Sequence, residues 1–555
     1  MTDQTSPLVA NPHVSSVRVS SVLGRAAHWR LAFAALVSLL AAACSAREPE
    51  RPQHVLLIVV DTLRADHLSI FGYPRPTSPN IDRLARNGVL FKRAISQSSF
   101  TSPSMVSLMT GQYIAKERQT IPSELPTLAE AFQRAGWKTG GFSANPVVSP
   151  QNGFHRGFDV FAAIEEHGPN AAVEAFVEAH RSERTFTYFH INEPHDEYLA
   201  PPGKRAWREA ASYLPGDRGD YYQQISAKLG LSEAPDDVRR VQEEIGGYDD
   251  EVRYADERVA ALLAVYERLG LMQDTLVVLT ADHGEGLWEQ VALMSGQRGS
   301  KLRAGEKPTL LNTLMPTHGN QVHQSLVHVP LVISGPGVPR GVPVNTPVEN
   351  VDLFPTLLEL ADVSTTGGLQ GSSLVPLMEK RANGERYGFS YTRFNVTVVD
   401  QDGWALILPT PEGECAEGIV LELHKLDEDP HQRRNLAAER PQIVERLKQV
   451  AMERQRAGIR EGDPQVTDEN LRVLAELGYV EQVERGTAKR DLQKRSTAEL
   501  LALLAVAPHC TERLLIVEEL AGRALDDAAL AALRAHREKE RALAVQAEID
   551  KLLAK

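Results

Sequence analysis

The stretch HVLLIVVDT, residues 54–62, is a short apolar run that ends in an acidic and a hydroxyl side chain. Its first seven residues are rich in β-branched side chains, which is typical of a strand buried on both faces. Three later runs have the same character: FTYFHI (186–191), TLVVLT (275–280) and PLVISG (330–335). Helical patterns separate these runs. Strands that alternate with helices predict an α/β fold with a mostly parallel central sheet flanked by helices.

The helical patterns and the composition of the remaining chain predict its domain organisation. Helices are expected at NIDRLARNG (80–88), LPTLAEAFQRAG (125–136) and 249–270, and polar insertions at 200–245 and 290–317. The chain turns β-rich after 375 and helical after 436. We therefore predict a leader and linker (1–49), a catalytic domain (50–375), a smaller C-terminal α+β part (376–462) and a helical extension (463–555), whose last stretch, 496–555, forms a helical tail.

The composition is that of a globular protein, with 555 residues of which 42% are hydrophobic and 24% are charged. The formal net charge is −13. A nucleic-acid partner is disfavoured, because phosphate backbones bind to a positive surface. A small anionic substrate remains compatible with this charge, since a metal ion outweighs it locally.

The N-terminal segment resembles an export signal. Three arginines (Arg18, Arg25 and Arg30) precede LAFAALVSLLAAA, residues 31–43, and Cys44 follows. This apolar run is shorter than the ~20 residues that span a bilayer, and its length matches a secretory signal. We expect export to the periplasm or cell envelope, with a lipid anchor on Cys44 as the membrane contact; a buried N-terminal helix is the alternative. A disulfide between Cys415 and Cys510 is open in an oxidising compartment.

Polar side chains follow three of the predicted strands. Asp61 ends the first, Asp282, His283 and Glu285 follow the third, and His195 lies just beyond the second. Ligands of open α/β sheets bind beyond the carboxyl ends of the strands. Each group alone is better explained as a helix cap or a hydrogen-bonded polar residue. Together they indicate a metal site that activates a nucleophile.

Several ordered motifs resemble the sulfatase family of the alkaline-phosphatase superfamily. VDTLRADHLSIFGYPRPTSPNIDRLARNGVLFKRA (60–94) is similar to the N-terminal signature of that family. The likeness continues through SLMTG (107–111), YDDEVRYADERV (248–259), ADHGE (281–285), VPLVISGPG (329–337), VDLFPTLLEL (351–360), GSSLVPLM (371–378) and LHKLDEDPHQRRNL (423–436). The likeness covers about residues 54–460, and residues 469–480 show a further short similarity.

The resemblance implies one divalent cation, Ca²⁺, Mg²⁺, Mn²⁺ or Zn²⁺, held by Asp61, Asp282, His283 and the oxygen of the nucleophile, Thr101. Thr62 stands where the family usually has a second Asp, which removes one carboxylate from the site.

Histidines fill the other implied roles. His195 is implied to contact the substrate, and His318 to contact the substrate and stabilise or protonate the leaving group. His190 and His323 are interpreted as structural rather than catalytic. Glu285 is a candidate for contacting the metal ligands without binding the metal itself.

Thr101 and Met105 are the main departures from the family. Sulfatases carry Cys or Ser in C/S-x-P-S-R and oxidise it to formylglycine, whereas this chain reads TSPSM (101–105). Threonine cannot become an aldehyde because its Cβ carries a methyl group. A metal-bound threonine oxygen is still a competent nucleophile, as in the bacterial sulfatase-like enzymes with Thr at this position. The alternative is that Thr101 caps an ordinary helix.

Three functions are compatible with these residues. The leading hypothesis is a metal-dependent hydrolase, a phosphodiesterase, or a phosphotransferase that acts on phosphate or phosphonate esters with Thr101 as nucleophile. The second is a sulfuric ester hydrolase that works without formylglycine. The third is a non-catalytic envelope binding protein on a sulfatase scaffold. The natural substrate and the oligomeric state are not predicted.

Overall fold

The computed structural model describes residues 51–554 apart from 116–119, 169, 211–226, 228–234, 290–313, 315–317, 365–366, 383, 411–419, 457–459, 462–487, 489–490, 508–509 and 541. The leader with Cys44, most of the 290–317 insertion, Cys415 and the short similarity at 469–480 therefore lie outside the described residues. Within the described ranges, no helix is long and apolar enough to cross a membrane.

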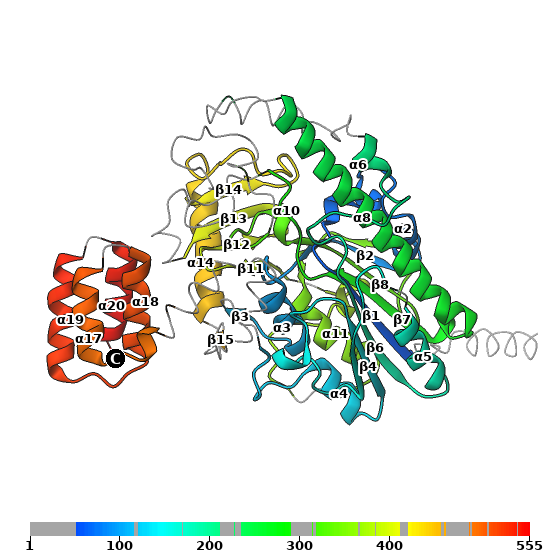
Figure 1. Ribbon diagram of the computed structural model, residues 1–555, viewed down its shortest axis with the longest axis horizontal. Coiled ribbons are helices and arrows are strands. Elements are labelled where there is room, and N and C mark those ends of the chain that lie inside the picture. Colours follow the sequence, from blue (N-terminus) through cyan, green and yellow to red (C-terminus); the bar gives the residue numbers. More distant parts are fainter. Residues whose placement is uncertain are drawn as a thin grey trace, which may run out of the picture. The chain divides into compact units, whose positions relative to one another are not determined.

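The central sheet confirms the predicted α/β fold (Figure 1). In the described part of the chain it has nine strands, in the order β10-β2-β8-β7-β1-β6-β4-β5, and β9 pairs with β2. The strands are β1 (His54–Val60), β2 (Val89–Ile95), β4 (Lys138–Ser143), β5 (Val160–Ala163), β6 (Thr185–Ile191), β7 (Thr275–Ala281), β8 (His328–Ser334), β9 (Val342–Val344) and β10 (Val348–Glu349). Only β8 runs antiparallel to its neighbours.

The centre of the sheet sets the position of the site. β1 pairs in parallel with β6 on one side and β7 on the other, so Val60 lies opposite both Ile191 and Ala281. All three strands are buried along their whole length, which explains their continuous apolar character. The residues that follow them, Asp61 and Asp282, therefore leave the sheet side by side at its carboxyl edge.

Helices cover both faces of the sheet (Figure 1). α2 (Pro79–Arg86) and α5 (Ala171–Ala179) pack against α8 (Pro235–Arg268), while α3 (Thr101–Thr110), α4 (Leu128–Arg134) and α11 (Leu353–Leu360) pack together on the other face. The shorter helices are α6 (Ala206–Ala210), α10 (Gln324–Val327) and α12 (Val375–Met378), with 3₁₀ turns η2 (Ala65–His67), η3 (Ser69–Phe71), η4 (Pro150–Asn152), η5 (Met272–Asp274) and η7 (Asn350–Asp352).

Helix α8 begins well before the predicted position. The expected helix started at 249, and 200–245 was expected to be a polar insertion, but α8 starts at Pro235. Val241 and Ile245 are fully buried and continue the helical spacing of Tyr248 and Val252. Charged residues between these buried positions make the segment look like a loop in sequence.

A smaller antiparallel sheet follows the catalytic fold, as predicted. It contains β11 (Gly388–Tyr391), β12 (Asn395–Val399), β13 (Trp404–Pro409) and β14 (Glu422–Lys425), and α14 (Pro441–Arg456) packs against β12 and β13. β15 (Arg460–Glu461) pairs with β3 (Ile114–Ala115). This sheet contacts the loop that carries His318, as described below.

The C-terminal tail is helical, in agreement with the sequence. α17 (Thr497–Val506), α18 (Cys510–Ala521), α19 (Asp527–Lys539) and α20 (Leu543–Leu553) bury an apolar core of their own. Ser496 and Glu499 form a capping box at the start of α17. Cys510 is disulfide-bonded, and the other two cysteines of the chain lie outside the described residues.

Candidate active site

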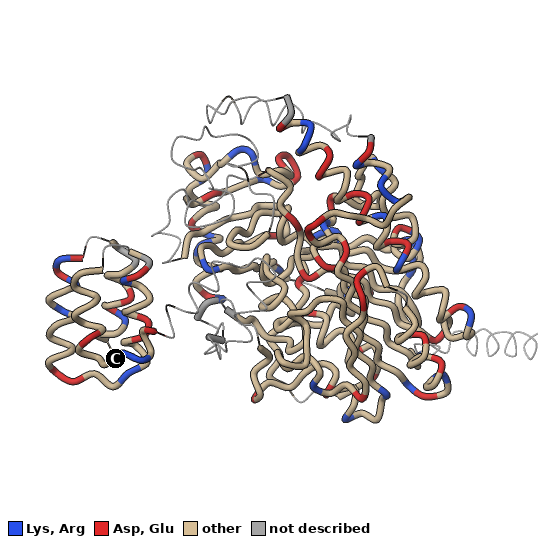
Figure 2. The backbone as a smooth tube through the Cα atoms, viewed as in Figure 1, with Lys and Arg blue, Asp and Glu red and all other residues tan. Residues whose placement is uncertain are grey.

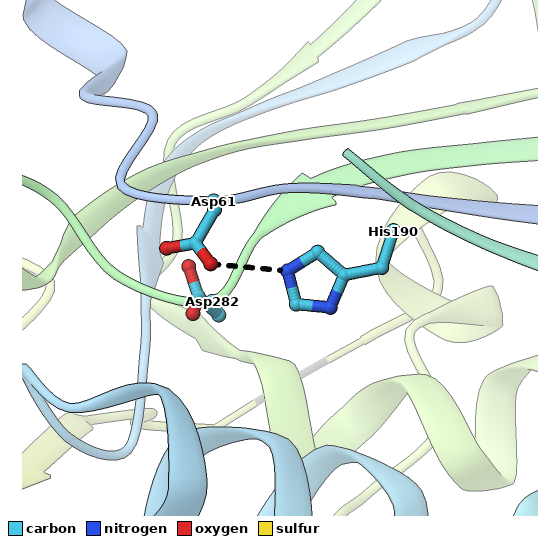
Figure 3. Close-up of side chains that lie close together, drawn as sticks. All are labelled: Asp61, His190 and Asp282. Atoms are coloured by element: carbon cyan, nitrogen blue, oxygen red, sulfur yellow. Dashed lines mark ion pairs between the residues drawn. The ribbon is translucent and has the colours of Figure 1, made fainter. Parts of the chain in front are cut away.

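Two carboxylates and an imidazole meet at the carboxyl edge of the sheet. One ligand atom each of Asp61, Asp282 and His190 lies within 4.8 Å of the others, and Figure 3 shows the three side chains gathered around one point. All three are fully buried. Asp61 Oδ1 and Asp282 Oδ2 accept no hydrogen bond from the described residues. Buried carboxylate oxygens without partners are costly unless a cation neutralises them.

The electrostatics of the two carboxylates also favour a bound cation. Burial would raise the pKa of Asp61, but the imidazoles of His190, His195 and His283 outweigh it and hold that pKa below its usual range. Burial, and then the neighbouring charge of Asp61, raise the pKa of Asp282. Two carboxylates this close resist being ionised together unless a positive ion lies between them.

His283 and Thr101 extend this cluster. His283 Nδ1 lies 2.8 Å from the Gly284 carbonyl oxygen, to which it donates, so its Nε2 carries the lone pair. That Nε2 lies 3.4 Å from Asp282 Oδ2 and 3.2 Å from Thr101 Oγ1. Ligand atoms of one divalent ion lie roughly 3–3.5 Å apart, since each is about 2.0–2.5 Å from the ion. His283 and Thr101 therefore lie at ligand spacing beside Asp282, next to the group formed by Asp61, Asp282 and His190.

Thr101 does not cap helix α3. The helix begins at Thr101 itself, Phe100 is the N-cap residue, and no side chain accepts a capping hydrogen bond there. The capping alternative is therefore wrong. The Thr101 hydroxyl is buried and bonds to His283, and it stands at the N-terminus of a ten-residue helix, where the helix dipole favours negative charge.

Thr62 occupies a strained backbone position next to Asp61. Its φ is 51°, which is rare for a β-branched residue. Its N–H donates to Asp282 Oδ1 at 3.1 Å, and its carbonyl accepts from the Tyr248 hydroxyl at 2.7 Å. Its own hydroxyl is buried and has no hydrogen-bond partner among the described residues. These bonds hold the Asp61–Thr62 turn against Asp282.

His190 lies nearer to the two carboxylates than the sequence indicated. It was interpreted as structural, yet its Nε2 lies 3.5 Å from Asp61 Oδ2. The only sequence signal was its place near the end of a strand that proves to be the neighbour of β1. Strand order decides this proximity, and a single sequence does not give strand order.

His318 lies beside Glu285 and His283. Its Nδ1 is 3.0 Å from Glu285 Oε1, and its ring centroid is 4.4 Å from that of His283. Burial, and then the charge of His195, lower the pKa of His318 to about 3. Burial raises the pKa of Glu285 to about 7. Glu285 therefore contacts His318, where the sequence interpretation placed it behind the metal ligands.

His195 completes the group of histidines. Its ring centroid lies 5.1 Å from that of His318, and its Nδ1 donates to the Asp196 carbonyl at 2.8 Å. Burial disfavours the charged imidazole, but the carboxylates of Asp61 and Glu285 outweigh it and raise the pKa of His195. An imidazole beside the metal cluster offers an N–H donor to an anionic substrate. The structure thus brings all the predicted site residues together.

Met105 offers no charge to the site. It stands where sulfatases have arginine, and its side chain is fully buried in the main apolar core. The basic residues of the second insertion, Lys301, Arg303 and Lys307, lie outside the described residues. The positive charge among the described site residues is therefore limited to the histidines and the implied cation.

The smaller sheet holds the loop that follows His318. His323 Nε2 lies 3.5 Å from Glu422 Oε2 at the start of β14, and the Gln324 N–H donates to Gln432 at 2.6 Å. The amide of Asn395, on β12, donates to the Asn320 carbonyl at 3.4 Å. His323 is thus structural, as the sequence suggested. These bonds fix the loop between His318 and β8.

Glu422 also contacts His424 of β14, with 2.8 Å between Oε2 and Nε2, and the stabilisation from this ion pair is expected to fall at alkaline pH. Burial opposes the charge on His424, but Asp429 and Glu422 outweigh it and raise its pKa from 6.5 to about 9. The stabilisation is complete below pH 6.5, where the imidazole is protonated in both the folded and the unfolded protein. It falls as the pH rises above 6.5, where only the folded imidazole keeps its proton, and is lost as the pH passes 9, where the folded imidazole becomes neutral too. We expect the free energy of unfolding to fall by at most about 3 kcal/mol between pH 6.5 and 9.5.

Urea unfolding at a series of pH values measures this loss. The variant His424→Gln should flatten the curve over the same interval. An equally steep fall in that variant would show that other groups cause it.

Comparisons with known proteins show the family of the chain. A family model described as Sulfatase matches residues 53–363, and one described as N-sulphoglucosamine sulphohydrolase, C-terminal, matches residues 320–457. An ulvan-active sulfatase of Formosa agariphila is 26% identical over 373 residues, which cover 60% of this chain and 66% of that protein. Human arylsulfatase A is 25% identical over 61% of this chain and 70% of its own length. The chain thus spans about two thirds of these relatives.

A solved structure shows the same fold. The phosphonate monoester hydrolase of Agrobacterium radiobacter superposes with a TM-score of 0.54 and 19% identity, over 73% of this chain and 95% of that one. At this identity the likeness concerns the fold alone.

Proposed function

The chain belongs to the sulfatase family of ester hydrolases, and from that premise we propose that it hydrolyses phosphate or phosphonate esters with Thr101 as the nucleophile. The observation that carries the proposal is the position of the Thr101 hydroxyl. It is buried, it lies 3.2 Å from His283 Nε2, and it shares the site with the carboxylates of Asp61 and Asp282. Formylglycine chemistry is closed to a threonine, whereas direct attack by its oxygen is not.

The metal would be held by Asp61, Asp282, His283 and Thr101, and it would supply positive charge that lowers the pKa of the threonine hydroxyl and attracts the substrate. Thr101 releases its hydroxyl proton to solvent, from which it is regained at the end of the cycle; its Oγ attacks phosphorus, the P–O bond to the leaving alcohol breaks, and the phosphoryl or phosphonyl group is left on the threonine. His195 donates a hydrogen bond to the equatorial oxygens. An incoming water, or an acceptor alcohol in a phosphotransferase, then breaks the P–Oγ bond and restores the hydroxyl.

The Glu285–His318 pair supplies the proton that the leaving group needs. We propose that His318, whose Nδ1 lies 3.0 Å from Glu285 Oε1, protonates the departing alkoxide through its other ring nitrogen, Nε2. The proton lost from Nε2 is replaced through Nδ1 by the proton that Glu285 holds. In the second half of the reaction the same nitrogen accepts a proton from the attacking water.

Sulfate ester hydrolysis is the second candidate, because the ulvan-active sulfatase and arylsulfatase A are both named sulfatases. The phosphonate monoester hydrolase shares the fold at a TM-score of 0.54, and a 2-O glycosaminoglycan sulfatase shares it at 0.52, so the fold does not rank the two candidates. A non-catalytic binding protein is the third candidate, and the presence of Asp61, Asp282, His283, Thr101 and His318 in one site argues against it.

A matched substrate panel tests this ranking. The metal-reconstituted protein is assayed with p-nitrophenyl phosphate, bis-p-nitrophenyl phosphate, p-nitrophenyl phenylphosphonate and p-nitrophenyl sulfate. We expect kcat/KM for at least one phosphorus ester to exceed that for the sulfate by about 100-fold or more, which corresponds to about 2.7 kcal/mol of transition-state discrimination. Preferential turnover of the sulfate would support the second candidate, and turnover of none would support the third.

We further propose that the protein is exported and anchored through lipidated Cys44, with a small anionic ester as its partner and no nucleic acid. Figure 2 shows Lys and Arg spread among Asp and Glu along the described chain, and the net charge is −13. The small residues AAA (41–43) directly before Cys44 support lipidation.

Mass spectrometry of the native protein tests the anchor. We expect a mature chain that begins at Cys44 and carries diacylglycerol, in the membrane fraction. The variant Cys44→Ser should leave the protein unlipidated. A native chain that begins at Met1 in the cytoplasm would contradict export.

A further inference from the structure

We propose that His190 is a ligand of the divalent cation and replaces the carboxylate lost at Thr62, so that the site selects a transition-series cation such as Zn²⁺ over Ca²⁺. The family pattern supplies a second acidic residue at position 62, and this chain supplies a neutral one. The imidazole of His190 comes from a different strand, β6.

The contacts of His190 leave its Nε2 available for a metal. The Nε2 atom is buried and has no hydrogen-bond partner among the described residues. Its distance to Asp61 Oδ2, 3.5 Å, is too long for a good hydrogen bond but suits two ligands of one ion. Figure 3 shows this nitrogen turned toward Asp61.

Tyr188 fixes the orientation of the ring. Its hydroxyl oxygen lies 2.8 Å from His190 Nδ1, and both side chains are fully buried. With the proton on Nδ1 donated to the Tyr188 oxygen, Nε2 carries the lone pair that a metal requires. Histidine ligands commonly donate their second nitrogen to a neighbouring oxygen in this way.

The resulting donor set is rich in nitrogen. Asp61, Asp282 and His190 form its centre, and His283 Nε2 adjoins this centre at 3.4 Å from Asp282 Oδ2 and 3.2 Å from the Thr101 hydroxyl oxygen. Two carboxylates balance the charge of one divalent cation. Imidazole suits Zn²⁺ and its neighbours, whereas Ca²⁺ prefers six to eight oxygen ligands. The loss of the carboxylate at position 62 and the presence of His190 both shift the preference of the site from Ca²⁺ toward Zn²⁺.

Metal content after competition tests the proposal without an activity assay. The apoprotein is dialysed against equal concentrations of free Zn²⁺, Mn²⁺, Mg²⁺ and Ca²⁺ and analysed by inductively coupled plasma mass spectrometry. We expect about one transition-series ion per chain, and His190→Ala should weaken Zn²⁺ binding by about 10-fold to 100-fold or more in calorimetric titration. Co²⁺ absorption spectra should differ between the two proteins, because one nitrogen ligand is lost.

A matched control and a reciprocal variant sharpen the result. His54 is also buried on the central sheet, at the opposite end of β1, and it bonds to Thr185; His54→Gln should bind metal as the unaltered protein does. The double variant Thr62→Asp, His190→Ala restores the family carboxylate at a φ that Asp tolerates better than Thr, and it should shift selection toward Ca²⁺ or Mg²⁺. Unchanged Zn²⁺ affinity in folded His190→Ala, or selection of Ca²⁺ by the unaltered protein, would overturn the proposal.

Discussion

Replacing Thr101 by alanine is expected to abolish turnover of the best phosphorus ester while the protein stays folded. Removal of a covalent nucleophile typically lowers kcat by ~10³-fold or more. The structural loss is small, because Thr101 is not a helix cap and gives up one hydrogen bond to His283, worth about 1 kcal/mol. Thr101→Ser keeps the hydroxyl and should retain measurable turnover.

The same helix offers a matched control for this variant. Ser107 is also buried in α3, and its hydroxyl donates to the Pro103 carbonyl at 2.8 Å. Ser107→Ala should cost a similar amount of stability, measured by urea unfolding, and leave turnover nearly unchanged. If Thr101→Ala kept near-normal turnover, the nucleophile would have to be another group.

Trapping the intermediate distinguishes the two ester classes. After brief incubation with substrate and an acid quench, the peptide that contains Thr101 should carry phosphate or phosphonate. Sulfate on that peptide would instead support the sulfuric ester hydrolase. Neither adduct should form in Thr101→Ala.

Replacing His318 by alanine is expected to slow the reaction in a way that depends on the leaving group. The imidazole protonates the departing oxygen, and a general acid contributes roughly 10²–10⁴-fold. Alkyl esters, whose alkoxides are strongly basic, should lose that full factor in kcat/KM. p-Nitrophenyl esters should lose little, because nitrophenolate leaves without a proton.

A plot of log kcat/KM against leaving-group pKa measures the effect. We expect a shallow slope for the unaltered protein and a steep one for His318→Ala. Glu285→Gln should give an intermediate slope, because the amide can still meet His318 but cannot supply a proton. As a control, His328→Gln alters a half-buried histidine of β8 that contacts the Lys92 carbonyl, and its slope should be unchanged. Equal slopes for His318→Ala and the unaltered protein would contradict the role of His318 as the general acid.

The sequence by itself determined the α/β class, the strands around 54–60, 186–191 and 275–280, and the helical tail. Each follows from local rules, since a run of β-branched residues or a 3.6-residue period is visible within a short window. The same rules failed at the start of α8, where buried positions alternate with many charges. The resemblance to the sulfatase family also implied the site residues Asp61, Thr101, Asp282, His283, His195 and His318.

Only the tertiary structure decided which of these groups touch. Strand order places β6 beside β1 and so brings His190 to the carboxylates, and the loop after His318 turns its ring onto Glu285. The start of α3 at Thr101 moves its hydroxyl from a capping role to a bond with His283. Such contacts join residues that are tens to hundreds of positions apart. They depend on the strand order and packing of the whole sheet, which no short window of sequence contains.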